Sequence, residues 1–287
     1  MENILLAGAT GYLGRYIVRE LTIWGIPAVA IVRHPEKLGE ADPEIIRVLK
    51  AQVTQPETLV GICNGIDTVI STIGITHKQG GFTYMNVDYQ ANLNLLREAQ
   101  QAKVRKFIYI SVIDGDKLRH LAITAAKEKF VDELKASGLE YTIIRPNGFY
   151  SDMKEFLKMA QKGKIYLFGN GEYKLNPIHG ADLAEVCVRA ISQKTIEIIV
   201  GGPDILTQNE IAEMAFSAWG KVPNIIHLPD WSRRALITGA KIFSTSKKFG
   251  ALEFFLTMMG RDNMAPRHGS YRLQDFYKRE VNNKTNN

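Results

Sequence analysis

The sequence predicts an α/β fold in which helices cover both faces of a parallel sheet. Short apolar segments rich in β-branched residues alternate with segments of helical periodicity through the first half of the 287-residue chain. The expected strands are Asn3–Ala7, Ala28–Val32, Ile46–Ala51, Thr68–Ile73, Lys106–Ser111 and Tyr141–Arg145. The expected helices are Gly11–Trp24, Pro56–Ile62, Tyr84–Ala102 and Ala125–Ser137. Because parallel crossovers are right-handed, this order predicts a doubly wound sheet.

The second half of the chain is less regular and predicts a smaller lobe. We expect a hairpin with its turn at Gly169–Gly171, a helix from Ala181 and a late strand in "IEIIVGG". Thr207 followed by Glu210 has the spacing of a capping box at a helix start. The predicted division is a nucleotide-binding core of residues 1–150, to which 178–203 return, and a substrate lobe of 151–177 and 204–287.

Composition excludes several classes of protein. No apolar run reaches the length of about 18 residues that a transmembrane helix needs. The start "MENILLAGATG" predicts a strand and lacks the features of a signal peptide. Cys63 and Cys187 stand far apart without metal-ligand spacing, so we expect reduced thiols, no metal and a cytoplasmic location. No helix-turn-helix or zinc spacing indicates nucleic-acid binding.

The positive charge lies near the C-terminus. Trp231–Asn287 carries eleven Lys/Arg against four Asp/Glu, whereas the whole chain has a net charge of +6. A solvated surface explains this as well as contact with a phosphate, a membrane surface or an acidic partner. The apolar stretch Phe249–Met259 is too short to span a bilayer. It either packs over the substrate cleft or belongs to a basic amphipathic surface that meets a membrane or a protein partner. The chain is expected to be a monomer or homodimer.

The stretch "LLAGATGYLGRYIV" carries the strongest functional signal. Gly8 suits a backbone angle that a Cβ forbids, Gly11 allows close approach of a ligand, and Gly14 allows the helix to pack tightly on the strand. The N–H groups of the first helical turn then converge on one point, where the helix dipole adds positive charge. Strand, turn and helix in this order predict a Rossmann-like dinucleotide site.

The segment after the second expected strand predicts which dinucleotide binds. NAD enzymes usually place an acidic residue there to hold the ribose hydroxyls. This chain has Arg33, and a guanidinium pairs with a 2′-phosphate that a carboxylate would repel. Lys37 and Arg15 are further candidates for the same phosphate. We therefore expect NADP(H) as the cofactor.

Five motifs together resemble the atypical short-chain dehydrogenase/reductases. They are "GATGYLG", "VRHPEKL", "STIG", "NVDYQANLNLLREAQQAKVRKFIYIS" and "SGLEYTIIRPNGFY". The NmrA-like, isoflavone reductase-like and divinyl chlorophyllide reductase-like groups are the most similar. The similarity covers about the first 190 residues in order and continues more weakly to about Trp231.

This resemblance implies positions for the cofactor residues. The phosphate loop matches Gly8, Thr10, Gly11, Tyr12, Leu13 and Gly14, and Arg33 matches the reader of the 2′-phosphate. Gln52 stands where such proteins often have an Asp near the adenine. The loop beside the ribose matches Ser71, Thr72, Ile73 and Gly74. The nicotinamide end matches Pro146, Asn147, Gly148 and Phe149.

The catalytic residues depart from the usual family pattern. Ordinary members carry Tyr-x-x-x-Lys, but Ile123 stands four residues before Lys127. Lys127 nevertheless precedes Tyr141 at the spacing of the lysine in isoflavone reductase-like enzymes. It either acts as a general acid/base, with a pKa lowered by desolvation, or holds the nicotinamide ribose. Ser111 and His179 are further catalytic candidates.

Two functions remain open at this point. One is an NADPH-dependent oxidoreductase that reduces a carbonyl or an activated double bond of a small-molecule substrate. The other is a non-catalytic NADP(H)-binding redox sensor or assembly factor, which the NmrA-like resemblance and the absent tyrosine support. A fold alone does not decide between them.

Overall fold

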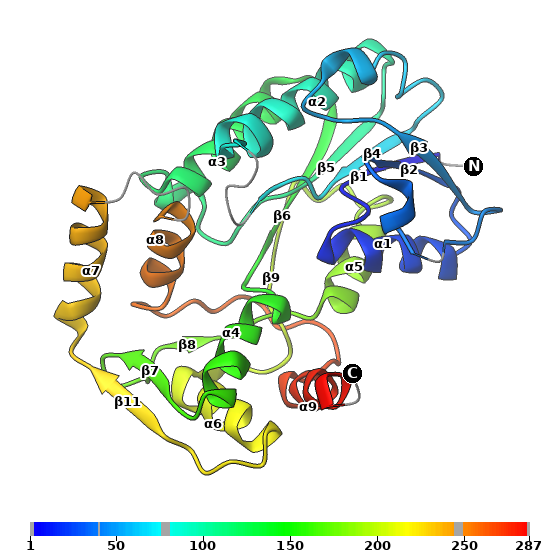
Figure 1. Ribbon diagram of the computed structural model, residues 1–287. Coiled ribbons are helices and arrows are strands. Elements are labelled where there is room, and N and C mark those ends of the chain that lie inside the picture. Colours follow the sequence, from blue (N-terminus) through cyan, green and yellow to red (C-terminus); the bar gives the residue numbers. More distant parts are fainter. Residues whose placement is uncertain (1–2, 40, 76–80, 244–248, 286–287) are drawn as a thin grey trace. The chain divides into compact units, whose positions relative to one another are not determined.

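The computed structural model describes residues 3–39, 41–75, 81–243 and 249–285 (Figure 1). The chain divides into two compact units. The first contains Met1–Arg145 and Leu183–Ile198, and the second contains Pro146–Asp182 and Ile199–Asn287. Lys247 and Lys248 of the predicted basic region lie outside the described residues.

A seven-stranded parallel sheet forms the centre of the first unit. Its order is β3-β2-β1-β4-β5-β6-β9. The strands are β1 (Ile4–Ala7), β2 (Ala28–Val32), β3 (Ile46–Lys50), β4 (Thr68–Ser71), β5 (Lys106–Ile110), β6 (Glu140–Pro146) and β9 (Glu197–Val200). The strand order reverses between β1 and β4, and such a switch point opens a crevice at the carboxyl ends of the strands. The predicted α/β, Rossmann-like fold is confirmed.

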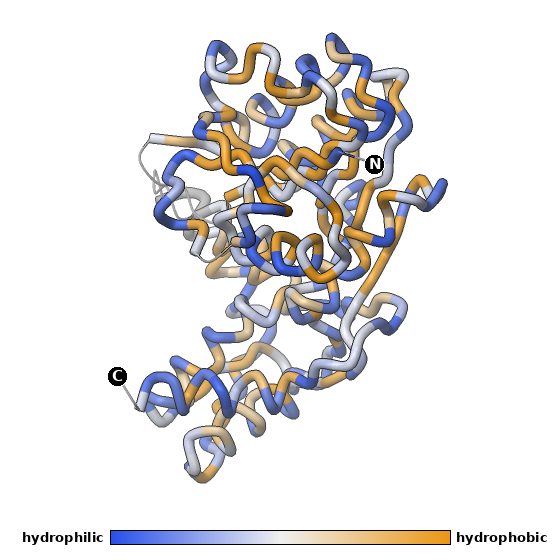
Figure 2. The backbone as a smooth tube through the Cα atoms, turned by 90° about the vertical axis from the view of Figure 1, so that its right-hand side faces the viewer, coloured by the Kyte–Doolittle hydropathy of each residue, from blue (hydrophilic) through white to orange (hydrophobic). Residues whose placement is uncertain are grey.

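Helices cover the two faces of this sheet because alternate strand residues are buried on opposite sides. The helices are α1 (Tyr12–Ile23), α2 (Asn92–Gln101), α3 (Ala122–Ala136) and α5 (Gly180–Arg189). Leu5 and Ala7 of β1 join one core cluster with Leu96 of α2 and Phe130 of α3. Figure 1 shows α2 and α3 on one side of the sheet and α1 on the other. The central strands β1 and β2 are buried along their whole length, and Figure 2 shows long hydrophobic stretches of backbone in orange.

Two helices of the first unit differ from their predicted form. Only a short 3-10 turn, Pro56–Thr58, stands where we predicted a helix over Pro56–Ile62. The helix predicted over Tyr84–Ala102 begins as a π-helix, Met85–Ala91, and continues as α2. The Asn92 side-chain amide donates hydrogen bonds to the carbonyls of Val87 and Asp88, which suits the wider turn.

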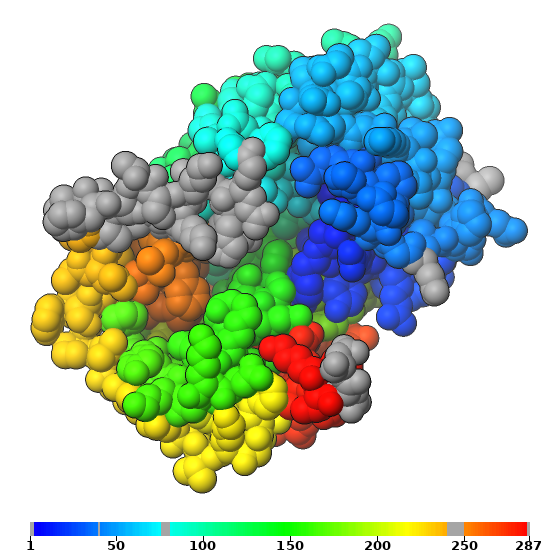
Figure 3. Space-filling view, viewed as in Figure 1, coloured from blue at the N-terminus to red at the C-terminus, as the bar shows by residue number. Residues whose placement is uncertain are grey.

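The second unit has its own core. Helices α4 (Tyr150–Gln161), α6 (Gln208–Ala218) and α9 (Leu273–Thr285) bury Phe156, Phe216 and Tyr277 in one cluster. These helices are neighbours on the surface in Figure 3, as green, yellow and red atoms. The remaining elements are β7 (Ile165–Phe168), β8 (Lys174–Leu175), β10 (Leu206–Thr207), β11 (Ile225–Leu228), α7 (Asp230–Phe243) and α8 (Phe249–Met258).

The predicted hairpin around Gly169–Gly171 is wrong. β7 pairs in parallel with β11, and β8 pairs antiparallel with β10. The two glycines do turn the chain with positive φ, but the turn is bound to the start of α6, where Asn209 donates to the carbonyl of Asn170. The predicted capping box is confirmed, since Thr207 Oγ1 accepts from the N–H of Glu210 and the Glu210 carboxylate accepts from the N–H of Thr207.

Candidate functional site

The glycine loop has the tight geometry that a phosphate loop needs. Gly8 has a φ of +90°, and a Cβ there would meet Thr72 Oγ1. A Cβ on Gly14 would overlap the carbonyl of Gly8, while the N–H of Gly11 donates to that same carbonyl at 2.9 Å. Gly11 is the N-cap of α1, and no side chain caps this helix start. The loop and the helix start therefore fit a diphosphate, whose oxygens accept from such N–H groups.

The loop after β4 packs directly against the glycine loop. Thr72 Oγ1 donates to the carbonyl of Ala7 at 3.2 Å. The buried Ser71 hydroxyl donates to Asn92 Oδ1 at 2.5 Å, and Ile73 is also buried. Gly74 ends this segment, and its missing side chain makes room for a charged pair formed by α3 and the π-helix.

The segment after β2 carries two cations, Arg33 and Lys37, and Arg15 of α1 contacts this segment. Arg33 and Lys37 are exposed. The Arg15 guanidinium donates to the carbonyls of Thr10, at 3.2 Å, and Lys37, at 2.9 Å, so it ties this segment to the glycine loop. Within the described part of the chain, Arg33 makes no hydrogen bond or ion pair, which leaves its guanidinium available for a phosphate.

Gln52 is the second residue after the end of β3. Its side-chain amide donates to Thr54 Oγ1 at 3.0 Å, and its backbone N–H donates to Thr58 Oγ1 at 3.0 Å. Its carbonyl oxygen can still accept from an adenine amino group, which a carboxylate would do in the usual family pattern.

Lys127 of α3 reaches the loop after β4, where it meets a buried carboxylate. Its Nζ lies 3.0 Å from Asp88 Oδ1 and 5.6 Å from the centroid of the Tyr109 ring. The Lys127 side chain is 14% exposed and that of Asp88 is 0% exposed. A Cβ on Gly74 would come within 2.9 Å of this ammonium. The ammonium therefore lies at the carboxyl edge of the sheet.

The expectation that desolvation lowers the pKa of Lys127 is wrong. Burial alone lowers the pKa of Lys127, but its interactions with Tyr109 and with the Asp88 carboxylate outweigh burial and raise the pKa above its ordinary value. Burial raises the pKa of Asp88, and the Lys127 ammonium opposes that rise. Lys127 is thus a persistent cation at neutral pH and a poor general base.

Ser111 belongs to a buried cluster of charges that the sequence reasoning missed. Its hydroxyl donates to Glu128 Oε1 at 2.7 Å. The Arg145 guanidinium donates to both oxygens of Glu128, at 2.6 and 2.9 Å. A Cβ on Gly115 would overlap Glu128, so the glycine leaves space for this pair. An arginine at the end of an apolar strand was the available signal, because buried arginine needs a carboxylate.

The four residues expected at the nicotinamide end, Pro146 to Phe149, belong to the second unit. Pro146 is also the last residue of β6. Asn147 is buried, and its side-chain N–H groups donate to Asn176 Oδ1 at 2.9 Å and to the carbonyl of Asn263 at 2.5 Å. Its Oδ1 accepts from the N–H of Gly148. Phe149 is the N-cap of α4. The Asn147 side chain is therefore engaged inside its own unit.

His179 is buried in an aromatic cluster of the second unit. Its ring stacks on Tyr271 with 4.2 Å between centroids and meets the Tyr150 ring edge-on at 5.5 Å. Nδ1 accepts from the N–H of Ala181 at 3.2 Å. Burial, with a smaller contribution from Arg279, lowers the pKa of His179 to about 4. His179 is therefore neutral at physiological pH and holds no proton to donate as an imidazolium.

Three tyrosines that could in principle donate a proton, Tyr84, Tyr109 and Tyr150, are buried. The Tyr150 hydroxyl donates to the carbonyl of Tyr271 at 2.7 Å. Burial raises the pKa of Tyr84 to about 12. Tyr109, which sequence reasoning did not single out, is the tyrosine beside Lys127. The position of Tyr109 on a central strand indicates a packing role, and its contact with Lys127 is visible only in the three-dimensional structure.

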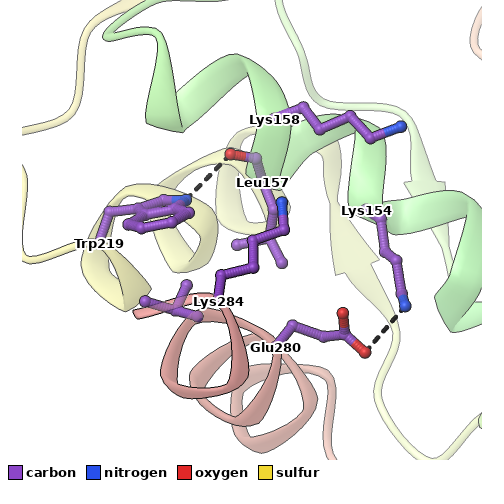
Figure 4. A pocket seen from close by; sticks show the side chains of 7 residues that line it. Lys154, Leu157, Lys158, Trp219, Glu280 and Lys284 are labelled. Carbon is purple, nitrogen blue, oxygen red and sulfur yellow. Dashed lines mark hydrogen bonds and ion pairs between the residues drawn. The ribbon is translucent and has the colours of Figure 1, made fainter. Parts of the chain in front are cut away.

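A cavity of about 140 Å³ lies in the second unit between α4, α6 and α9 (Figure 4). The Trp219 indole N–H donates to the carbonyl of Leu157 at 3.0 Å, and Lys154 pairs with Glu280 at 2.8 Å. Figure 4 shows Lys284 beside the indole. This surface cavity gathers cations, but its lining is held together by its own contacts.

Neither a metal site nor a membrane span is found among the residues that the structure describes. No group of three or more His, Cys, Asp or Glu is placed to hold a metal ion there. Within the same residues, no helix has the length and apolar character needed to cross a bilayer.

The fold and the glycine loop define a nucleotide-binding protein of the Rossmann-like class. A sequence model of the family described as NAD(P)H-binding matches residues 8–194. The chain therefore belongs to the NAD(P)H-binding family, which confirms both the predicted nicotinamide dinucleotide and the resemblance to the dehydrogenase/reductases.

The chain is similar to two proteins of known name in sequence and to a solved oxidoreductase in fold. The chain is 30% identical to divinyl chlorophyllide a 8-vinyl-reductase of Oryza sativa subsp. indica, over 97% of this chain and 78% of that protein. It is 27% identical to photosystem II assembly factor Ycf39 of Guillardia theta, over 79% and 73%. The NADPH-dependent quinone oxidoreductase QOR2 of Escherichia coli, solved with NADPH, is 19% identical with a TM-score of 0.70, over 98% and 99%; this likeness concerns the fold.

Proposed function

We propose that this chain is an NADPH-dependent reductase that acts on a carbonyl or an activated double bond of a small, hydrophobic substrate. The observation that carries the proposal is the buried Lys127–Asp88 pair against the loop after β4, the loop that itself packs on the glycine loop. A structural ion pair alone would not need a lysine that remains 14% exposed at the carboxyl edge of the sheet. The vinyl reductase relative supports the same reaction class.

The glycine loop and Arg33 bind the two ends of the phosphate-bearing half of the cofactor in this proposal. The uncapped start of α1 holds the diphosphate, and Arg33 pairs with the 2′-phosphate. Arg15 holds the Lys37 segment against the glycine loop, so the two phosphate sites keep a fixed spacing. The bound cofactor supplies a hydride to the substrate.

Lys127 stabilises negative charge and holds hydroxyl groups. Hydride addition to a polarised double bond leaves negative charge on the conjugated atoms, and a fixed ammonium stabilises that charge. Because the pKa of Lys127 is raised, the final proton comes from water and not from the lysine. In this assignment Lys127 does not act as an acid or a base. It donates hydrogen bonds and stabilises negative charge.

Calorimetry with NADPH and NADH tests the cofactor assignment. The wild-type chain is expected to bind NADPH more tightly, and Arg33→Asp to lose that preference because a carboxylate repels the 2′-phosphate. Arg47→Asp makes the same charge change on an exposed side chain at the amino end of β3, the end opposite to that of the glycine loop. It should leave the preference for NADPH intact. Equal affinities in the wild type would remove Arg33 from the site.

Oxidation of NADPH, followed by absorbance, tests the reaction class. The first acceptors to try are divinyl chlorophyllide a and quinones, the compounds named for the relatives. Lys127→Met should lower kcat by about a hundredfold if the ammonium stabilises the developing charge. Lys129→Met, on the same helix with its ammonium over the Tyr89 ring, is the matched control.

A second candidate function is an assembly factor that binds NADP(H) without turnover. The 27% identity to the photosystem II assembly factor favours it, and α7 offers Trp231, which is 69% exposed, as a contact for a protein partner. NADPH binding without oxidation in the presence of either acceptor class would favour this candidate over the reductase.

A further inference from the structure

We propose that Asp88 and Tyr109 are positioning residues that hold Lys127 as a permanent ammonium, in place of a tyrosine–lysine proton relay. The inference deepens the proposed reductase and rests on it. It assigns a role to two buried residues that are not part of the glycine loop. It also explains how the chain functions without a tyrosine four residues before Lys127.

The Asp88 carboxylate is fixed at both oxygens. Oδ1 lies 3.0 Å from Lys127 Nζ, and Oδ2 accepts from the N–H of Ile75 at 3.2 Å. The carboxylate therefore joins the loop after β4 to α3. Since Asp88 is fully buried, water cannot replace either contact, and the charge of Lys127 is the counterion that burial of this acid requires.

The π-helix provides the backbone geometry that places Asp88 there. Asn92, at the start of α2, accepts from the Ser71 hydroxyl at 2.5 Å and donates to the carbonyls of Asp88 and Ile73. These bonds tie the wide turn to the end of β4. A π-turn inside an α-helix is uncommon and often marks a functional position, and here it carries the counterion of the candidate catalytic lysine.

Tyr109 supplies the second wall of the lysine site. The ring lies below the ammonium at 5.6 Å and against Phe130 at 4.6 Å. Its hydroxyl is fully buried with no other hydrogen-bond partner among the described residues, and it is close enough to Lys127 to interact. The hydroxyl cannot touch a substrate, so Tyr109 acts through the lysine by a cation–π contact and a buried oxygen.

The charged groups around Lys127 can be named element by element. The π-helix contributes Asp88 and β5 contributes Tyr109, while the described part of the loop after β4, which ends at Ile75, contributes the backbone of Gly74 and Ile75. Glu128 of α3 also affects Tyr109, but its carboxylate is held by Arg145. Asp88 is therefore the ionised group that sets the charge of Lys127.

Direct titration of Lys127 tests the proposal without any substrate. The ε-CH₂ signals of the labelled protein, assigned with Lys127→Arg, are followed by NMR as pH rises. In the wild type, Lys127 should stay protonated after the exposed lysines have titrated. In Asp88→Asn, burial remains and the counterion is lost, so Lys127 should release its proton before the exposed lysines do. Tyr109→Phe should shift it in the same direction by less.

Matched variants separate this effect from misfolding. Asp132→Asn removes a carboxylate from the same helix as Lys127, where it pairs with exposed Arg119, and should leave the titration unchanged. Asp88→Glu restores a carboxylate and should restore a late titration. Wild-type Lys127 that titrates with the exposed lysines, or an unchanged titration in folded Asp88→Asn, would overturn the proposal.

The pH profile of turnover provides the second readout. Loss of the ammonium follows rising pH, so wild-type kcat should be flat up to pH 9. In Asp88→Asn, kcat should fall by about tenfold for each pH unit above the lowered pKa. A flat profile in that variant would contradict the proposal while leaving the reductase in place. Failure of the wild type to bind NADPH would instead remove the proposed function.

Discussion

Each unit contains a prominent cluster of buried polar groups, and the two clusters differ in charge. The first unit buries opposite charges against each other, in the pairs Lys127–Asp88 and Arg145–Glu128. The centre of the second unit is an amide network, in which Asn147 donates to Asn176 and both bind backbone carbonyls. A buried ion pair has a larger desolvation cost than a hydrogen bond between two side-chain amides, and its stability depends on both partners being charged.

The difference between the charged pairs and the amide network indicates which unit can stabilise a charged transition state. A buried charge fixes an electrostatic potential, which a reaction that develops charge can use. An uncharged network fixes shape and is indifferent to pH over a wide range. The proposed division of labour follows: the first unit supplies charge at the sheet edge, and the amides of the second unit maintain a framework.

Glu128→Gln should be the most damaging single change in this comparison. It leaves Arg145 buried with only the half-exposed Glu197 as counterion, and loss of one partner of a buried pair costs about 3–5 kcal/mol. Urea unfolding followed through Trp24, the tryptophan of the first unit, measures the free energy of unfolding. Asp132→Asn, in an exposed pair, should cost less than about 1 kcal/mol. A loss of that small size for Glu128→Gln would show that the pair contributes little.

The second unit should respond to acid through His179. The pKa of His179 is about 4 when folded and 6.5 when exposed. The unfolded chain therefore binds a proton below pH 6.5 that the folded chain refuses until about pH 4. Stability is full above pH 6.5 and falls by about 3 kcal/mol as pH approaches 4.

His179→Asn tests this linkage, because Asn retains an acceptor for the Ala181 N–H and does not titrate. The difference in unfolding free energy between wild type and variant should shrink by that amount between pH 7 and pH 4, measured by urea unfolding through the tryptophans of the second unit. A difference that does not change with pH would mean that His179 accepts its proton in the folded state.

The sequence predicted the parts of the fold that depend on local pattern. Strand–helix alternation sufficed to predict the sheet, and the glycines at 8, 11 and 14 sufficed to predict the tight turn between β1 and α1, because each requires a residue type at a fixed spacing. The ionic site escaped prediction, since Asp88 and Lys127 are 39 positions apart in the sequence and meet only when a π-turn faces α3. The hairpin failed for a related reason: β7 prefers a distant partner, β11.

Asn176→Ala should cost the second unit about 2 kcal/mol. Asn176 Oδ1 accepts from Asn147 and from the N–H of Ala265, and its Nδ2 donates to the carbonyls of Gly202 and Ala265. Each bond contributes about 0.5–1.5 kcal/mol, and the variant leaves buried partners unsatisfied. The loss should be equal at pH 5.5 and pH 8, since no member titrates.

Exposed Asn224→Ala removes one surface bond to the carbonyl of Gly163 and should cost under about 0.5 kcal/mol. A loss for Asn176→Ala that grows with acidity would contradict the view that the network is uncharged.

Trp219→Phe should have a smaller effect than Asn176→Ala, and it tests whether charge also matters in the second unit. The indole N–H donates to the carbonyl of Leu157 at 3.0 Å, which joins α6 to α4 beside the lysine-lined cavity of Figure 4. Phenylalanine keeps most of the apolar contact and loses one hydrogen bond, worth about 1 kcal/mol. Thermal unfolding followed by circular dichroism should therefore show a small decrease in Tm, independent of salt. A decrease that salt reverses would instead mean that Lys154, Lys158 and Lys284 repel one another once the indole is gone, and that charge matters in this unit too.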